Sequence, residues 1–64
     1  MKRFSFVTGT VPETGGEGVE FESGLTAWRE RVADVWTTIH VTSRQDIEDQ
    51  YGAQPGYKFT WTDK

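Results

Sequence analysis

The residues in this sequence that come nearest to a reactive site lie in one segment, H-V-T-S-R-Q-D-I-E-D-Q-Y-G, at positions 40–52. The segment holds the only histidine of the chain, His40, followed by Thr42, Ser43 and three carboxylates. Nucleophilic catalysis needs a hydroxyl or thiol beside a base that a third group orients, and a metal site needs matched ligands with a supporting shell. A single imidazole and no cysteine supply neither arrangement. We therefore predict that the protein is not an enzyme and that it binds no metal and no cofactor.

The same segment is typical of a place where a strand ends and a helix begins. Ser43 takes the N-cap position of a helix over 44–51, and Asp46 lies three residues later, where the acid of a capping box belongs. Carboxylates in the first turns are favoured by the helix dipole, so no metal is needed to explain them. Gly52 stands where a left-handed residue often ends a helix. We therefore predict a structural role for the segment.

Periodic patterns predict the remaining elements. Alternating polar and apolar residues, which are typical of half-buried strands, occur in four segments. These are residues 2–8, 19–23, 35–42 and 57–64. Between the second and third segments, apolar residues recur at the spacing of a helix face, which favours an amphipathic helix over 25–34. They are Leu25, Trp28, Val32 and Val35. A strand in a β-meander is the alternative for the same residues. The predicted order is β-β-α-β-α-β, an α+β fold with a mainly antiparallel sheet of about four strands and two short helices on one face.

Length and composition set further limits. The 64 residues make a single small domain, residues 1–64, and without cysteine its core must consist of apolar packing alone. Residues 9–18 are rich in glycine and contain two glutamates, and they are predicted to form a flexible acidic loop. No apolar run approaches the about 18 residues of a membrane span. We therefore expect a cytoplasmic protein without membrane contact.

An uncovered sheet face is the surface that we expect to bind a partner. We expect both helices to cover the side that carries Phe4, Ile39 and Val41. The opposite side is then nearly free of acids and presents hydroxyls, cations and the indole of Trp36, whose exposure favours use as an interface. The residues predicted to bind are Arg3, Trp36, Thr38, His40, Lys58 and Thr60 on this face, with Glu13 and Glu17 in the loop. A solvated face whose threonines serve β-propensity is the alternative.

These expectations describe a small interaction module or inhibitor whose partner is another protein or a second copy of the chain. No small-molecule substrate is indicated. Ten acidic and seven basic residues give a net charge of −3, which weighs against a general hold on nucleic acid. Single-stranded nucleic acid stacked on Trp36 is one alternative, and a purely structural or homodimerisation role is another. A further hypothesis is that four glutamates imitate a phosphate backbone. They are Glu13, Glu17, Glu20 and Glu22.

Overall fold

The computed structural model describes residues 1–9 and 11–62. Over these residues the chain forms five strands and one helix in the order β-β-β-β-α-β. The elements are β1 (Lys2–Val7), β2 (Thr14–Glu20), β3 (Leu25–Val32), β4 (Val35–Ser43), α1 (Arg44–Tyr51) and β5 (Lys58–Trp61). The expected α+β class with an antiparallel sheet is confirmed, but a fifth strand replaces the first of the two expected helices. Thr10 of the expected loop, and Asp63 and Lys64 of the expected last strand, lie outside the described residues.

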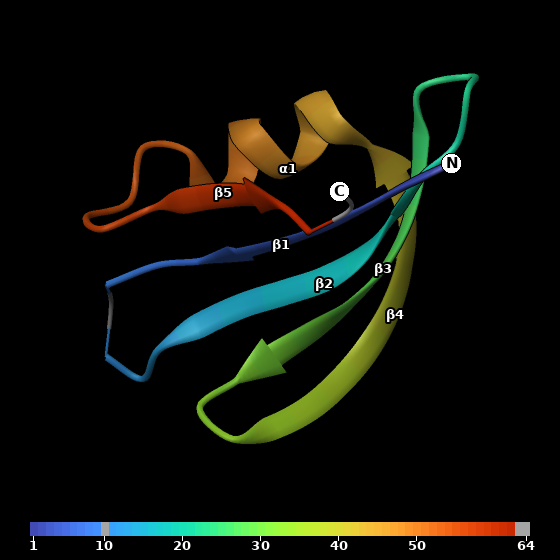
Figure 1. The fold of residues 1–64 in the computed structure, drawn as a ribbon. Helices are drawn as coiled ribbons and strands as arrows, with labels where there is room; N and C mark the ends of the chain where they lie inside the picture. The colour runs from blue at the N-terminus through green and yellow to red at the C-terminus, as the bar shows by residue number, and fades with distance from the viewer. Residues whose placement is uncertain (10, 63–64) are drawn as a thin grey trace.

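The strands lie in the spatial order β4-β3-β2-β1-β5, and every neighbouring pair is antiparallel. The first four strands follow one another as hairpins, after which α1 carries the chain back so that β5 pairs with β1 (Figure 1). Figure 1 also shows α1 beside β5, while β3 and β4 curve away from the helix. The sheet is therefore open, with β4 and β5 at its edges and with one face partly covered by α1.

Residues 25–32 form strand β3, so the predicted helix was wrong and the β-meander alternative was correct. The side of β3 that faces the core carries Thr26, Trp28 and Glu30. Thr26 is buried, and its hydroxyl donates to the carbonyl oxygen of Thr42 at 2.7 Å. Because a buried threonine and a glutamate interrupt the apolar alternation, the sequence of this strand does not show a period of two.

The glycine-rich segment also differs from the prediction, because residues 14–18 of the expected loop belong to strand β2. Phe6 of β1 lies opposite Gly16. Trp28 of β3 lies opposite Gly18. A Cβ atom on Gly16 would lie 2.8 Å from the rings of both Phe6 and Trp28. Because Gly16 and Gly18 carry no side chains on this side of β2, the two rings meet across the strand edge to face, with centroids 5.4 Å apart. The glycines are thus part of the core packing.

The core lies between this side of the sheet and α1. Its buried hydrophobic residues are Phe4, Phe6, Trp28, Ile47 and Tyr51. The Tyr51 ring of α1 packs on Phe6 with centroids 5.0 Å apart. The Phe59 ring of β5 stacks on Phe4 at the same distance. Aromatic rings from separate elements therefore supply most of the core, as a chain without cysteine requires.

Helix α1 begins as predicted and ends differently. The Asp46 N–H donates to the Ser43 hydroxyl, and the Ser43 N–H donates to the Asp46 carboxylate, each at 3.2 Å. Gly52 has φ −60° and ψ −27°, so it is right-handed, and its N–H donates to the Glu48 carbonyl oxygen at 2.7 Å. A Cβ at this position would overlap that oxygen, so close approach explains the glycine. No helix of the described residues is long and apolar enough to span a bilayer.

Cationic side chains attach the start of α1 to β5. The Arg44 guanidinium lies 4.5 Å from the ring centroid of Phe59 and 5.2 Å from that of Trp61. Glu48, one turn further along the helix, forms an ion pair with Arg44 at 3.2 Å. The Lys2 ammonium, from β1, lies 5.4 Å from the Trp61 centroid on the same strand β5. Contacts of this kind contribute about 0.5–1 kcal/mol each at exposed sites, so they orient the helix more than they stabilise it.

Candidate functional site

The register of the sheet assigns each strand residue to one of two faces. Residues directly opposite each other in neighbouring strands share a face, and successive residues of one strand lie on opposite faces. The face that contacts α1 is the inner face, and the other is the outer face. The side chains of the outer face include Arg3, Ser5 and Val7 of β1, Glu17 and Val19 of β2, Leu25, Ala27, Arg29 and Arg31 of β3, Trp36, Ile39 and Val41 of β4, and Lys58 and Thr60 of β5.

A bulge in β4 decides which of its side chains reach the outer face. Arg29 of β3 pairs with Ile39. Two residues later, Arg31 pairs with Trp36. Glu30, between the two arginines, therefore faces two residues of β4, Thr37 and Thr38, and this is the bulge. Trp36 and Ile39 therefore share the outer face although they are three positions apart, whereas His40 lies on the inner face. The expected placement of His40 on the uncovered face and of Ile39 in the core was wrong.

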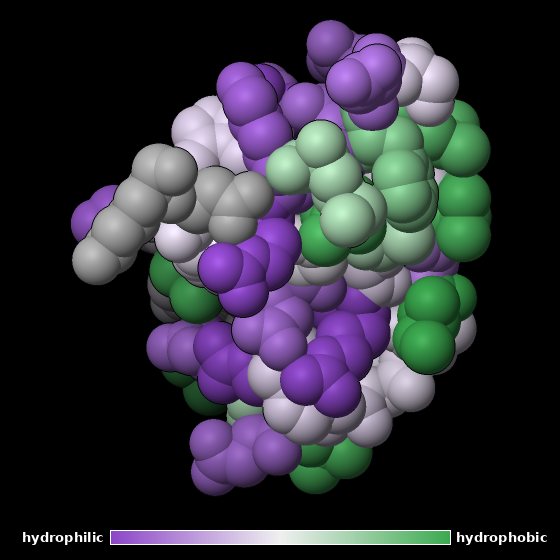
Figure 2. Space-filling view, turned by 45° about the vertical axis from the view of Figure 1, so that its right-hand side comes forward, coloured by the Kyte–Doolittle hydropathy of each residue, from purple (hydrophilic) through white to green (hydrophobic). Residues whose placement is uncertain are grey.

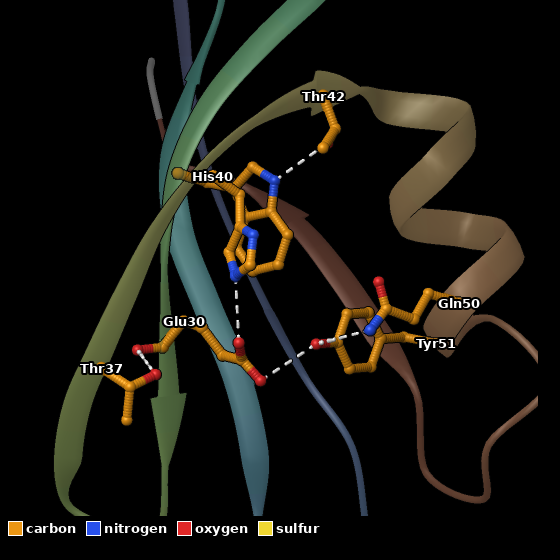
Figure 3. A network of polar contacts seen from close by, with 7 residues as sticks. Glu30, Thr37, His40, Thr42, Gln50 and Tyr51 are labelled. Atoms are coloured by element: carbon orange, nitrogen blue, oxygen red, sulfur yellow. Dashed lines mark hydrogen bonds and ion pairs between the residues drawn. The ribbon is translucent and has the colours of Figure 1, made fainter.

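On the inner face, the histidine belongs to a network of polar side chains (Figure 3). The His40 imidazole Nε2 donates to Glu30 Oε1 at 3.0 Å. The Tyr51 hydroxyl donates to Glu30 Oε2 at 3.2 Å, and Gln50 Nε2 donates to the Tyr51 hydroxyl at 3.4 Å. The Trp28 ring stacks on the imidazole with centroids 4.5 Å apart. Both carboxylate oxygens of Glu30 are thus satisfied, one by β4 and one by α1.

The geometry of this network favours a structural role. A nucleophilic relay needs a hydroxyl beside an imidazole that a carboxylate orients. The hydroxyl of Thr42 instead accepts the Trp28 indole N–H at 3.1 Å and donates to the Ser43 carbonyl oxygen at 3.2 Å. Among residues 1–9 and 11–62, no three His, Asp or Glu side chains are grouped as metal ligands would be. The network's clearest effect is to join β3, β4 and α1.

The burial of Tyr51 makes the stability of the protein sensitive to strongly alkaline pH. Burial raises the pKa of Tyr51 from 10.0 to about 12, with smaller contributions from the Glu30 charge and its hydrogen bond. Because the folded-state pKa is the higher one, the neutral phenol stabilises the fold fully below pH 10.0, and this contribution is lost as the pH rises to about 12. We expect the free energy of unfolding in urea to fall across this window, and to fall less in Tyr51→Phe.

The Tyr57→Phe variant measures the contribution of the second tyrosine to this alkaline loss. Burial also raises the pKa of Tyr57, so part of the alkaline loss remains when Tyr51 is replaced. The two single variants should each reduce the slope of unfolding free energy against pH. A slope in Tyr51→Phe equal to that of the wild type would contradict the expectation.

The outer face carries exposed apolar side chains around a hollow of about 520 Å³. Its apolar lining includes Val19, Ala27 and Ile39. Ala27 lies between Val19 and Val41 in the register, so its short side chain leaves this space open. Ile39 and Val41 are 75% and 64% exposed, although both were expected in the core. With the side that carries β3 and β4 turned forward, Figure 2 shows hydrophobic residues gathered along one margin next to strongly hydrophilic ones.

Charged side chains form ion pairs at the border of the hollow and further along the outer face. Arg29 donates to Glu17 at 2.8 Å, and its guanidinium lies over the Trp36 ring, 4.1 Å from the centroid. Arg31 donates to Glu13 at 3.0 Å. Because an arginine neutralises each of these two glutamates, this part of the surface is mixed in charge. The hypothesis of a phosphate-like row of four glutamates therefore gains no support from the geometry.

The structure divides the residues that were predicted to bind a partner. On or beside the outer face lie Arg3, Glu13, Glu17, Trp36, Lys58 and Thr60. Thr38 is exposed within the bulge, and His40 lies on the opposite side. Val19, Ala27 and Ile39 were not among the residues predicted to bind. Ile39 was expected on the covered face, because a period of two gives two faces without saying which one the helix covers. Ala27 lay within the helix that was predicted over 25–34.

Comparison with known proteins assigns no family. No family model, no curated protein and no solved structure matches this chain.

Proposed function

We propose that this protein is a non-enzymatic binding module that holds another protein on its outer face. The proposal is supported by the apolar group around the hollow, which consists of Val19, Ala27, Ile39 and Val41. Contiguous exposed apolar side chains with a polar rim are typical of protein interaction sites. Arginine is enriched in such interfaces, and here Arg3 and Arg29 border the hollow.

The shape of the hollow suggests what the partner contributes. Protein interfaces obtain most of their affinity from a few anchor side chains that fill pockets from which water is excluded. The floor of Val19 and Ala27 suits an aliphatic or aromatic anchor. The charged groups at the rim suit polar contacts, which set orientation and association rate more than affinity.

The Ala27→Lys variant tests this function. It fills the hollow with a charged side chain and leaves the free edge of the sheet untouched. Binding of a partner would then bury an unpaired ammonium, so we expect at least about a tenfold loss of affinity, or about 1.4 kcal/mol. The measurement is quantitative capture from source-cell extract on immobilised protein, followed by titration with the purified captured protein.

The matched control is Gln45→Lys, which introduces the same side chain on the exposed surface of α1. We expect it to retain the same protein as the wild type. If Ala27→Lys and Gln45→Lys retain the same partner with equal affinity, the outer face is not the binding surface and the proposal fails.

Single-stranded nucleic acid remains the alternative ligand of this face. The contact of Arg29 with one face of the Trp36 indole leaves less of the ring for base stacking, and Glu17 lowers the local positive charge. Titration with oligonucleotides at about 50 mM and about 200 mM salt separates the two ligands. Micromolar affinity with a steep dependence on salt would replace the protein partner by nucleic acid.

A further inference from the structure

The edge of the sheet at β4 is open to a further strand. β4 is nine residues long, Val35–Ser43, and ends the spatial order of strands (Figure 1). Natural edge strands are usually protected by charged side chains, by proline or by short length. Within Val35–Ser43 the one ionisable side chain is His40, and proline is absent. The opposite edge, β5, has four residues and begins with Lys58. A bulge also protects edges, but in β4 it lies between Trp36 and Ile39, so the part of β4 from Ile39 onward is the less protected edge.

Hydrogen bonds in the neighbouring hairpin show which peptide groups of β4 point out of the sheet. In antiparallel strands each residue directs its N–H and C=O toward the same neighbour, and successive residues alternate. The Phe21 N–H donates to the Leu25 carbonyl oxygen at 2.8 Å, so Leu25 and, two residues later, Ala27 bond toward β2. Thr26 and Trp28 consequently bond toward β4.

The β4 residues opposite these two are Thr42 and His40, so both direct their peptide groups into the sheet. The peptide groups of Ile39 and Val41 then point outward by the same alternation. At the next outward position, the Ser43 N–H already donates to the capping carboxylate of α1. Toward the other end of β4 the bulge interrupts the alternation. Ile39 and Val41 are therefore the positions of β4 that present a regular pairing edge.

We propose that two copies of this chain pair through β4, antiparallel and centred on His40. Ile39 of each copy then stands opposite Val41 of the partner subunit, and each such pair exchanges two backbone hydrogen bonds. His40 stands opposite His40 of the partner subunit as a pair without backbone hydrogen bonds. The result is one continuous sheet across a two-fold axis.

A second copy suits this edge because β4 carries no Lys, Arg, Asp or Glu. Two β4 strands can therefore pair without placing like charges of these residues opposite each other. The two-fold axis also creates two equivalent contacts on the outer face, each between Ile39 of one copy and Val41 of the partner subunit. A register centred on Ile39 would set Val41 against the bulge, and one centred on Val41 would set Ile39 against the capped Ser43. The register centred on His40 is the one that pairs both outward positions.

Strand pairing leaves both outer faces on the same side and their hollows uncovered, so the dimer does not depend on the proposed function. A strand pair of this length is expected to bury less than the about 1,200 Å² of a stable interface. We therefore expect a weak dimer with a dissociation constant of about 10–100 μM.

Sedimentation equilibrium of the purified chain over a concentration series is the first test. The Val41 N–H points away from the sheet, so Val41→Pro removes a donor that only the dimer uses. We expect Val41→Pro to weaken self-association at least about tenfold. A wild type that is monomeric up to about 1 mM overturns the proposal. So does a folded Val41→Pro variant that associates as tightly as the wild type.

Cysteine substitution tests the register, because the chain contains no other cysteine. Opposed residues of a pair without backbone hydrogen bonds have Cα atoms about 4.5 Å apart, within the range of a disulfide. We expect His40→Cys to oxidise to a covalent dimer. The matched control is Thr42→Cys on the same strand and face, which stands opposite Thr38 of the partner subunit and should therefore form no covalent dimer. Linkage through position 42 alone, or through neither position in folded variants, overturns the proposal.

Discussion

The Phe6→Ala variant is expected to lose about 3–5 kcal/mol, a large part of the stability of the fold. The Phe6 side chain is 1% exposed, and its ring centroid lies 5.4 Å from that of Trp28 and 5.0 Å from that of Tyr51. Tyr57 adds a third ring at 6.2 Å. Truncation of a buried Phe costs about 3–5 kcal/mol, whereas a chain of 64 residues has about 3–10 kcal/mol of total stability. Far-UV and near-UV circular dichroism, with urea unfolding where a transition remains, measure the loss.

Phe21→Ala is the matched control, because the same side chain is removed from a residue that is 42% exposed. We expect this variant to remain folded and to lose at most about 1.5 kcal/mol. Equal stability of the two variants would show that Phe6 is not at the centre of the core.

The Gly16→Val variant is expected to lose about 2–3 kcal/mol by overpacking. In an ordinary strand the change from glycine to a β-branched residue is favourable. Here the new Cβ would lie 2.8 Å from ring atoms of both Phe6 and Trp28 and 2.9 Å from the Arg29 carbonyl oxygen, so the two rings would have to separate. Urea unfolding gives the free energy, and the near-UV spectrum reports the ring contact.

Glu17→Val is the control for this variant, since it introduces the same side chain one position further along β2 but on the outer face. It removes the ion pair with Arg29, which at an exposed site contributes at most about 1 kcal/mol. A Gly16→Val variant as stable as Glu17→Val would mean that the glycines of β2 do not serve ring packing.

The sequence predicted those elements whose local signals agree with their surroundings. Alternation located the strand that carries Phe4, and the capping residues Ser43 and Asp46 located the start of α1. These features depend on bonds between near neighbours or on one buried face, so a single sequence contains them. The same holds for β5, whose Phe59 was expected to face the core and packs on Phe4.

Tertiary contacts determine the elements that were predicted wrongly from the sequence. β3 was misassigned because two of its inner-face positions, Thr26 and Glu30, are polar residues whose partners come from β4 and α1. Residues 14–18 of β2 were misassigned because Gly16 makes room for rings of the two adjacent strands, which a turn-forming interpretation of glycine does not consider. Ile39, Val41 and His40 of β4 were assigned to the wrong faces because the inner side of this strand supplies polar partners, among them the Thr42 hydroxyl that accepts the Trp28 N–H. Each error concerns a partner that is distant in sequence.

The three indoles of the chain occupy different surroundings. Trp28 is 3% exposed in the core, Trp36 lies on the outer face under the Arg29 guanidinium, and Trp61 lies at the β5 edge near Arg44. Their fluorescence should therefore differ, with the bluest emission from the enclosed ring. A ligand that displaces Arg29 is expected to change the fluorescence of Trp36, whereas denaturation changes the fluorescence of all three tryptophans. Intrinsic tryptophan fluorescence should therefore distinguish ligand binding at the outer face from unfolding.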